Sequence, residues 1–163
     1  MEASVAPAGV ALEDFRETLS RVPSPVTIVT TLSEGRAHAT TVSAFTSLSA
    51  DPPLVLVALD RSSDLLELLH GVGRFAVNLL AEDQAHIGLD CAKKGSDKLA
   101  NVSWHAEQDL PRIDDAAAWL VCEVEQILPG GDHEIVIGLV TGCETGVEEP
   151  LVYHRRRFLR LAE

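Results

Sequence analysis

The sequence predicts a mainly β protein, a β-barrel of antiparallel hairpins with short helices at its periphery. Three observations predict this class: six or seven segments have strand patterns, the helical segments are short, and the two do not alternate as in a doubly wound sheet. The 163 residues suffice for one domain with a full core. We therefore expect one domain over residues 11–163, after a disordered Ala-, Pro- and Gly-rich tail at residues 1–10.

The composition argues against several classes of protein. The net charge is −12, whereas general nucleic-acid binding requires a basic face. No stretch approaches the roughly 18–20 apolar residues of a membrane-spanning helix, and the acidic N-terminus is unlike a secretory signal. The widely spaced Cys91, Cys122 and Cys143 form no metal-ligand motif and fit reduced thiols in the cytoplasm. Because 46% of the residues are hydrophobic, mostly aliphatic, we also expect a buried subunit interface.

The first expected elements are a helix and a hairpin. Apolar residues at helical spacing predict a short amphipathic helix over residues 11–21, which two prolines end. The β-branched run at residues 26–32 predicts a strand, and a turn follows it. Residues 36–48 are expected to return antiparallel as one extended strand, which completes the hairpin.

The stretch at residues 40–64 has three parts. A segment rich in Ser and Thr is followed by a proline pair, and the apolar run Leu54–Leu59 then predicts a strand buried on both faces. The polar corner Asp60–Asp64 begins a helix that Ser62 or Ser63 can cap. Exposed backbone N–H groups at such a helix start bind anions, phosphate above all. The alternative is an ordinary capped helix that binds nothing, and these residues alone favour it.

The rest of the chain continues with strands and short helices. The strand expected at residues 118–128 alternates between apolar and acidic residues, which predicts one exposed face. Gly138 marks either a bulge or a close approach of two backbones. The remaining expected elements are strands at residues 74–80, 134–141 and 151–161 and a helix at residues 83–93.

Familiar catalytic motifs are absent from the sequence. It contains no GxSxG, no Walker loop, no HExxH and no Rossmann GxGxxG. One histidine stands out, because Gly130-Gly131-Asp132 places His133 at the mouth of a tight turn. A turn residue that hydrogen-bonds its own loop is the plainer interpretation, and His133 taken alone favours it.

Seven segments taken together resemble one known family. They are, in order, VTIVTT, TTVSAFTSLSADPPLVLVALDRSS, GRFAVNLLAEDQ, KKGSDKLANVSW, AAAWLVCEVE, GDHEIVIGLV and EPLVYHRRRF. Over roughly residues 15–160 the chain resembles the short-chain flavin reductases, the reductase components of two-component flavin-dependent monooxygenases. The resemblance implies a flavin-binding split barrel with a Greek-key-like order of strands, usually assembled as a homodimer.

The resemblance also implies a site. The flavin ring is expected to face the backbone and hydroxyls of Thr41–Ala44, and no metal is implied. His133 matches the family histidine beside the nicotinamide and is the candidate catalytic residue. The candidate cofactor-binding residues are Thr41, Val42, Ser43, Ala44, Ser47, Ser49, Asp60, Ser62, Ser63, Phe75, Asn78, Lys93, Lys94, Lys98, Tyr153 and Arg155.

Within this set the resemblance gives most groups a role. Ser47 and Ser49 line the route to the flavin phosphate, and the corner Asp60–Ser63 binds that phosphate. The three lysines reach a flavin phosphate or a dinucleotide, while Tyr153 and Arg155 close the pocket. Four residues depart from the family pattern, and the last two of them alter the expected shape of the nicotinamide pocket: Pro25, Ala39, Arg156 and Leu99.

The implied chemistry is hydride transfer from NADH or NADPH to FMN or FAD, which needs two stacked rings and no protein nucleophile. Small residues, Ala44 and Gly138, are expected to allow the rings to approach closely. Reduced flavin then leaves for a partner monooxygenase. The alternatives are a flavin-binding or storage module without turnover, and a split-barrel oxidase or haem-binding relative. His133 separates them, because a protein that only binds flavin does not need it.

Overall fold

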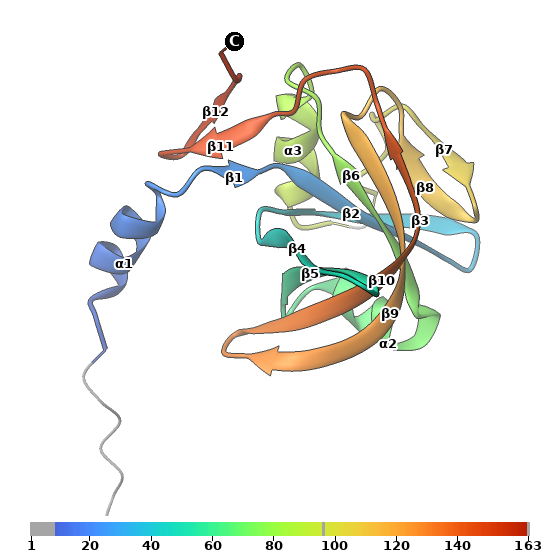
Figure 1. Ribbon diagram of the computed structural model, residues 1–163, viewed down its shortest axis with the longest axis horizontal. Coiled ribbons are helices and arrows are strands. Elements are labelled where there is room, and N and C mark those ends of the chain that lie inside the picture. Colours follow the sequence, from blue (N-terminus) through green and yellow to red (C-terminus); the bar gives the residue numbers. More distant parts are fainter. Residues whose placement is uncertain (1–8, 96, 163) are drawn as a thin grey trace, which may run out of the picture.

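The computed structural model describes residues 9–95 and 97–162, and its body is one curled antiparallel sheet (Figure 1). Hydrogen bonds join seven strands in the order β3-β2-β6-β9-β10-β5-β4. Within the described residues the ladder stays open between β3 and β4, which are its two edges. The strands are β2 Thr27–Ser33, β3 Arg36–Val42, β4 Phe45–Ala50, β5 Pro53–Asp60, β6 Arg74–Leu79, β9 Ala118–Gly130 and β10 His133–Thr145.

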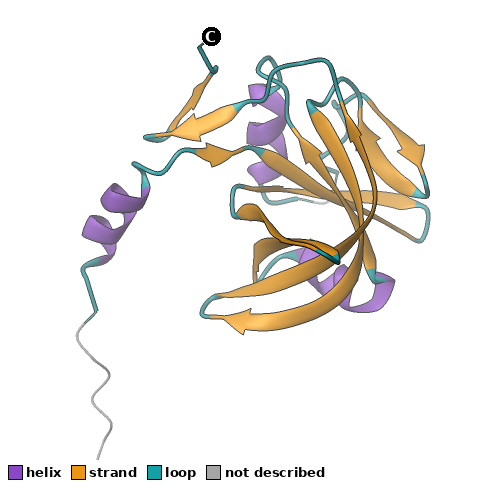
Figure 2. Cartoon of the chain, in the orientation of Figure 1, coloured by secondary structure: helices purple, strands orange, loops and turns teal. Residues whose placement is uncertain are grey.

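The described residues form three short helices that lie outside the sheet (Figure 2): α1 Leu12–Leu19, α2 Asp64–Val72 and α3 Ala85–Ala92. The mainly β class with peripheral helices is thus confirmed. No helix in the described part of the chain is long and apolar enough to cross a membrane. Of the tail expected to be disordered, residues 1–8 lie outside the described residues. Two smaller sheets complete the fold, one of β1 Ser24–Pro25, β11 Val152–His154 and β12 Arg157–Leu159, the other of β7 Trp104–Glu107 and β8 Leu110–Ile113.

The core lies on both faces of the middle strands. On one face Val29 and Phe75 pack in a cluster with the leucines of α2, and on the other Ile28 and Leu80 pack with residues of α3. The strand β5 differs, because its residues alternate between buried and half-exposed. The prediction of a strand buried on both faces is therefore wrong for β5. It lies next to an edge, and its outer face joins none of the core clusters of the described residues.

The single strand expected at residues 36–48 is in fact two strands. The chain bends at Ser43, where the Phe45 N–H donates to the Ser43 carbonyl at 2.9 Å. Before the bend β3 pairs with β2, and after it β4 pairs with β5 at the opposite edge of the sheet. The hairpin of β2 and β3 is confirmed, but its second strand ends at Val42. The bend therefore carries the chain across the open seam between β3 and β4.

Gly138 lies at a bulge, which is one of the two alternatives that the sequence predicts, and its close contacts are with side chains rather than with another backbone. The register between β9 and β10 shifts between Ile137 and Gly138. A Cβ atom at Gly138 would lie 2.6 Å from Phe75 Cζ and 2.9 Å from Cys122 Cβ. Because Gly138 is buried in the core, the expectation that it makes room for a flavin ring is wrong.

Two hairpins differ from the sequence prediction. The hairpin of β7 and β8 was not predicted, and it pairs Trp104 with Ile113. The last strand expected at residues 151–161 is a second hairpin, β11 with β12. Its turn consists of Arg155 and Arg156, whose φ angles of 49° and 62° lie in the left-handed region. Glycine is the residue that usually adopts this conformation, so the pair of arginines did not indicate a turn.

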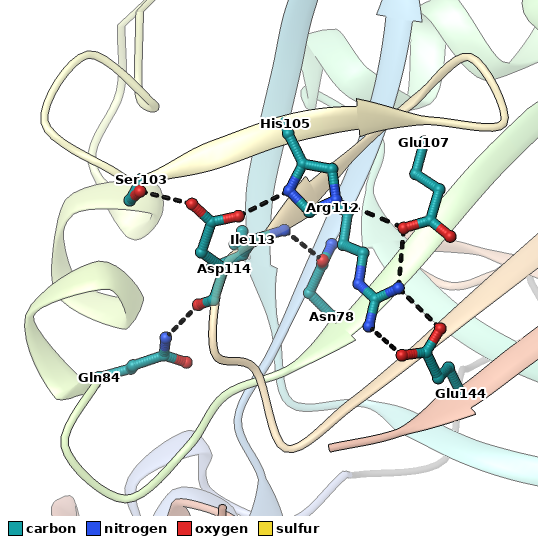
Figure 3. A network of polar contacts seen from close by, with 9 residues as sticks. All are labelled: Asn78, Gln84, Ser103, His105, Glu107, Arg112, Ile113, Asp114 and Glu144. Carbon is teal, nitrogen blue, oxygen red and sulfur yellow. Dashed lines mark hydrogen bonds and ion pairs between the residues drawn. The ribbon is translucent and has the colours of Figure 1, made fainter. Parts of the chain in front are cut away.

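A polar network fastens the β7–β8 hairpin to the sheet (Figure 3). The Arg112 guanidinium contacts Glu107 and Glu144, each at 2.8 Å, and lies over the Trp119 ring. The hydrogen bonds that Arg112 donates to these carboxylates, Glu144 first, raise the pKa of Arg112. A second branch of the network joins His105 Nδ1 to Asp114 Oδ1 at 2.6 Å. The hairpin is therefore held by ion pairs as well as by its ladder.

This network should make stability depend on pH. The hydrogen bond to Asp114 raises the pKa of His105, so its contribution is complete below the ordinary histidine pKa and is lost as pH rises through the raised value. Hydrogen bonds from Ser103 and then His105 lower the pKa of Asp114, so its contribution is lost as pH falls. The ion pair of His105 and Asp114 therefore contributes most to the stability of the folded protein between about pH 4 and pH 6.5.

His105→Gln should lower the melting temperature at about pH 5.5, where the charged His105 contributes to stability. It should leave the melting temperature unchanged at about pH 9, where that contribution has been lost. The loss should stay under about 1 kcal/mol, because the His105 side chain is 53% exposed and solvent screens the pair. The control is His86→Gln, an exposed histidine without an ion pair among the described residues. Equal shifts at both pH values would show that the ion pair adds nothing.

Candidate functional site

Two clefts lie toward opposite ends of the edge strand β3. The first, of about 690 Å³, lies between α1, the bend after β3 and the turn of the last hairpin. It brings together Ser43, Ala44 and Tyr153, three of the residues expected to contact the flavin. Arg156 lines this cleft, whereas the predicted Arg155 does not, because the turn directs the two neighbouring arginines differently. The Arg155 N–H instead donates to the Ser20 carbonyl at 2.8 Å.

The second cleft, of about 660 Å³, lies between β3, the corner before α2 and the loop after α3. It brings together six of the predicted residues, from two segments about 30 positions apart in the sequence: Asp60, Ser62, Ser63, Lys93, Lys94 and Lys98. The bend and the corner are joined directly, because the Ala58 N–H donates to the Ala44 carbonyl at 3.0 Å, two residues before Asp60. One backbone hydrogen bond therefore holds the bend that borders the first cleft close to the strand that leads into the corner of the second.

The corner is built around the Asp60 carboxylate. Its Oδ1 accepts hydrogen bonds from the Ser62 N–H at 2.7 Å and from the Ser62 hydroxyl at 2.6 Å. These two bonds, the hydroxyl first, lower the pKa of Asp60 and keep it ionised. Asp60 and the Ser62 hydroxyl thus shape the corner. A carboxylate would repel a phosphate, so the predicted role of Asp60 in contacting the phosphate is better described as holding the loop.

Ser63 occupies the N-cap position of α2, but its hydroxyl makes no capping hydrogen bond. The first hydrogen bond of the helix runs from the Glu67 N–H to the Ser63 carbonyl at 3.3 Å. The N–H groups of Asp64, Leu65 and Leu66 precede that bond, so they have no carbonyl within the helix to accept them. Together with the helix dipole they favour an anion at the Ser63 end of the cleft.

The second cleft gathers cations on an acidic protein. Arg36, Lys94 and Lys98 line it and have no ion pair within the described residues, whereas Lys93 pairs with Asp90 at 2.7 Å. The chain as a whole carries a net charge of −12. Three carboxylates, Asp60, Asp64 and Glu67, line the cleft too, so its cations outnumber its carboxylates by one and offset locally the charge that would repel an anionic ligand.

Phe75 and Asn78 do not belong to either cleft, and the prediction that they bind cofactor is wrong. Both are fully buried. The Asn78 amide donates to the Ile28 carbonyl at 3.1 Å, and its oxygen accepts from the Ile113 N–H at 2.8 Å. Because its polar atoms are satisfied inside the protein, Asn78 ties β6 to β2 and to β8 rather than to a ligand.

Other predicted residues lie near the clefts without lining them. The Thr41 hydroxyl donates to the Gly88 carbonyl of α3 at 2.7 Å, and the Val42 side chain is buried in the core. Ser47 and Ser49 lie on the edge strand β4 and line neither cleft. His133 is opposite Asp60 in the ladder, is 42% exposed and contacts Asp132 Oδ1 at 2.7 Å through Nδ1. Its role stays a prediction.

Sequence reasoning missed Arg36, His38 and Thr40, which line the second cleft from β3. They alternate along the strand, so they share one face, while Ala37 and Ala39 pack in the core on the other. The alternation was visible in the sequence. It carried no signal of a site because it did not reveal that α2 would pack across that face.

The flavin reductase like domain matches the chain over residues 19–162. The chain belongs to the flavin reductase family. The 4-nitrophenol 4-monooxygenase/4-nitrocatechol 2-monooxygenase reductase component of Rhodococcus opacus is 39% identical over 145 residues, which are 89% of this chain and 78% of that relative. The 4-hydroxyphenylacetate 3-monooxygenase reductase component of Thermus thermophilus is 39% identical over 150 residues, 91% of this chain and 96% of the relative. The predicted family and enzyme class are confirmed.

Solved structures agree with this assignment. The flavin reductase PheA2 superposes with a TM-score of 0.87 and is 30% identical, over 94% of this chain and 100% of that one. The Streptomyces globisporus NADH:FAD oxidoreductase SgcE6, in complex with NAD and FAD fragments, gives a TM-score of 0.89 and 29% identity over 94% of this chain and 96% of the other. The curled sheet with its open seam is thus the split barrel of the flavin reductases.

The residues of the two clefts fit a flavin nucleotide chemically. Exposed Ser43 and Ala44 offer a small, polar surface to a ring, and the Ser63 corner offers a hydroxyl and N–H donors to a phosphate. No group of metal-ligating residues occurs in the described ranges 9–95 and 97–162. The donors at the Ser63 corner suit the anionic end of an organic ligand, and the small surface at Ser43 and Ala44 suits its ring.

Proposed function

We propose that this flavin reductase oxidises NADH or NADPH, reduces FMN or FAD, and supplies the reduced flavin to a partner monooxygenase. The observation that carries the proposal is the second cleft, whose lining combines the N–H-rich start of α2 with Arg36 and three lysines on an acidic protein. The names of several relatives specify NADH, which favours NADH as the donor here.

Each end of the site has its own task in the proposal. Ser43 and Ala44 receive the flavin ring, and the corner at Ser63 receives the phosphate. The bound flavin supplies the hydride acceptor, its N5 atom, for the nicotinamide C4. His133 orients the nicotinamide nucleotide by donating a hydrogen bond, while Asp132 holds its other ring nitrogen. The protein thus contributes position rather than a nucleophile.

The test is absorbance at the nicotinamide band during turnover. Purified protein should oxidise NADH only when free FMN or FAD is added, and catalytic amounts of protein should consume NADH continuously while oxygen reoxidises the flavin. Tight flavin binding without NADH oxidation would establish the storage alternative instead. A haem Soret band in the purified protein would favour the haem-binding alternative.

Ser63→Ala should weaken FMN binding roughly tenfold or more and leave riboflavin binding unchanged, because riboflavin lacks the phosphate that the hydroxyl meets. Stability should hardly change, since the Ser63 side chain makes no capping bond. Ser33→Ala is the matched control, because Ser33 lies at the end of β2 and lines neither cleft. Fluorescence titration with both flavins checks the result. Equal losses for FMN and riboflavin in Ser63→Ala would make the corner structural.

The homodimer is part of the proposal, and two unpacked apolar surfaces support it. The helix α1 buries no residue within the described chain, and Phe15 and Leu19 are 51% and 47% exposed. The outer face of β5 and β10 carries half-exposed aliphatic residues that join no core cluster: Leu54, Leu56, Ala58, Ile135, Ile137 and Leu139. Surfaces of this kind are typical of subunit interfaces.

Light scattering at micromolar concentration should therefore give the mass of a dimer. Leu56→Glu should shift the mass to that of a monomer, because it places a charge in the outer apolar face. Leu89→Glu is the control, since Leu89 is 56% exposed on α3, away from that face. A monomeric mass for the unchanged protein would contradict the proposal.

We also propose a cytoplasmic location. The cysteines Cys91, Cys122 and Cys143 are all free thiols, as expected in a reducing compartment. Burial raises the pKa of Cys91 to about 11 and that of Cys122 to about 12, so both remain protonated and unreactive.

The relatives named as reductase components act with a separate monooxygenase. We propose the same division of labour here.

A further inference from the structure

The first cleft carries a positive charge that the proposed place of the flavin phosphate, in the second cleft, does not explain. Arg16 lines the first cleft from α1 and Arg156 from the turn of the last hairpin, whereas no carboxylate among the described residues lines it. Arg16 has no ion pair within the described residues. Arg156 lies 3.8 Å from Glu17, which also pairs with Arg21, and these side chains are more than half exposed. On a chain with a net charge of −12, two such guanidinium groups in one cleft indicate an anionic ligand.

The backbone position of Arg156 suits glycine better than arginine. Arg155 and Arg156 form a two-residue hairpin turn, and both have positive φ angles, 49° and 62°. Such turns favour Asn-Gly or Gly-Gly, because a residue with a Cβ atom is strained at positive φ. Arg156 is also one of the four residues that depart from the family pattern. A strained residue whose side chain lines a cleft points to a function for that side chain.

We propose that Arg16 and Arg156 form a subsite for the diphosphate of NADH or NADPH, which Arg156 supplies although the turn would be more stable with glycine. The inference rests on the proposed function. The nicotinamide ring has to stack on the flavin ring, which is placed at Ser43 and Ala44 in the same cleft. In the dinucleotide the diphosphate follows the nicotinamide ribose, so it comes within reach of the walls of that cleft.

The side chains of the cleft suit this part of the ligand. The two arginines come from different elements, and the planar fork of each can donate two hydrogen bonds to one phosphate group. Tyr153 lines the same cleft, is 36% exposed and packs on Phe158 with ring centroids 5.3 Å apart. A tyrosine held in this way offers a fixed flat surface beside the two cations. The subsite therefore binds the anionic part of the hydride donor, while the reacting ring lies on the flavin.

Arg156→Gly tests the subsite, because it removes the guanidinium group and relieves the turn at the same time. The melting temperature should rise by roughly 1–4 °C. The affinity of the flavin-loaded protein for NAD⁺ should fall about tenfold, as expected for a charge-assisted hydrogen bond. NAD⁺ cannot reduce oxidised flavin, so calorimetric titration measures binding alone.

Steady-state kinetics give a second measurement on the same variant. The Michaelis constant for NADH should rise about tenfold with little change in kcat, because the diphosphate is remote from the reacting atoms. Reduced nicotinamide riboside carries the same hydride donor without a phosphate, so both proteins should oxidise it equally well. Arg16→Gln should reproduce the losses with NAD⁺ and NADH without the rise in melting temperature.

The matched control is Arg157→Gln, which removes a charge from the same hairpin but from a residue that lines neither cleft. It should change none of these values. Equal losses for NADH and the riboside in Arg156→Gly, or an unchanged affinity for NAD⁺, would overturn the subsite. A loss of FMN affinity with NAD⁺ affinity intact would also overturn it, by assigning the arginines to the flavin phosphate. No oxidation of NADH by the unchanged protein would instead overturn the proposed function, and the subsite with it.

Discussion

Gly138→Ala should lower the free energy of unfolding by about 1–3 kcal/mol, and Gly138→Val by more, because the added atoms overpack a filled core. The new Cβ would lie 2.6 Å from Phe75 Cζ and 2.9 Å from Cys122 Cβ. Phe75 is fully buried, so its ring has no solvent to move into. Urea unfolding followed by fluorescence or circular dichroism gives the midpoint from which the change is calculated.

Two further variants make this prediction specific. Gly142→Ala lies on the same strand, but its Cβ would meet the flexible end of Gln108 at 3.3 Å and Val121 Cβ at an ordinary contact distance of 3.7 Å, so its stability should change little. Adding Phe75→Leu to Gly138→Ala removes the atom in closest contact and should restore part of the lost stability. If Gly138→Ala were as stable as the unchanged protein, the bulge at Ile137 and Gly138 would have to be deformable.

His133→Ala should reduce the catalytic efficiency with NADH by roughly ten- to hundredfold, while the affinity for flavin stays nearly unchanged. A hydrogen bond to a charged group is worth about 1.5–3 kcal/mol, and each 1.36 kcal/mol corresponds to a factor of ten. The loss should fall mainly on the Michaelis constant for NADH, because the proposed contact holds the nucleotide. Steady-state kinetics and a flavin titration on one preparation separate the two ligands.

The competing role of His133 is to hold its own turn, which its contact with Asp132 at 2.7 Å supports. That role predicts a lower melting temperature with intact kinetics per folded molecule. Asp132→Asn tests it, because it weakens the same contact from a side chain that is 92% exposed. Unchanged kinetics in both variants would remove His133 from the site and leave the function resting on the flavin clefts.

Local patterns predicted the elements well but not their partners. Apolar runs located β2, β5, β6 and β10, and alternation located β9, because these patterns reflect burial that each strand meets wherever it pairs. They did not show that residues 36–48 divide at Ser43 between opposite edges of the sheet, since partner choice depends on distant strands. The turn at Arg155 and Arg156 was hidden because neither residue favours positive φ.

The candidate site was predicted in part for the same reason. The corner at Ser63 follows from a local rule about helix starts, and the structure places it in a cleft with the expected lysines. Asn78 was misassigned because a polar residue inside an apolar strand signals either a ligand contact or an internal hydrogen bond, and only the packed structure distinguishes them. Arg36 and His38 were missed because α2 forms the opposite side of the cleft that they line, and the sequence did not show where α2 packs.

The strand order has a consequence for synthesis on the ribosome. Val57 of β5 pairs with Val136 of β10, so an apolar strand that is buried on one face emerges long before its main partner exists. At about 5–20 residues per second, the intervening chain takes roughly 4–16 s to make. Throughout that interval β5 has only the polar edge strand β4 to pair with, and its aliphatic side chains remain exposed to other nascent chains. Slower translation of residues 60–136 should therefore lower the yield of folded protein, and chaperone supply should restore it.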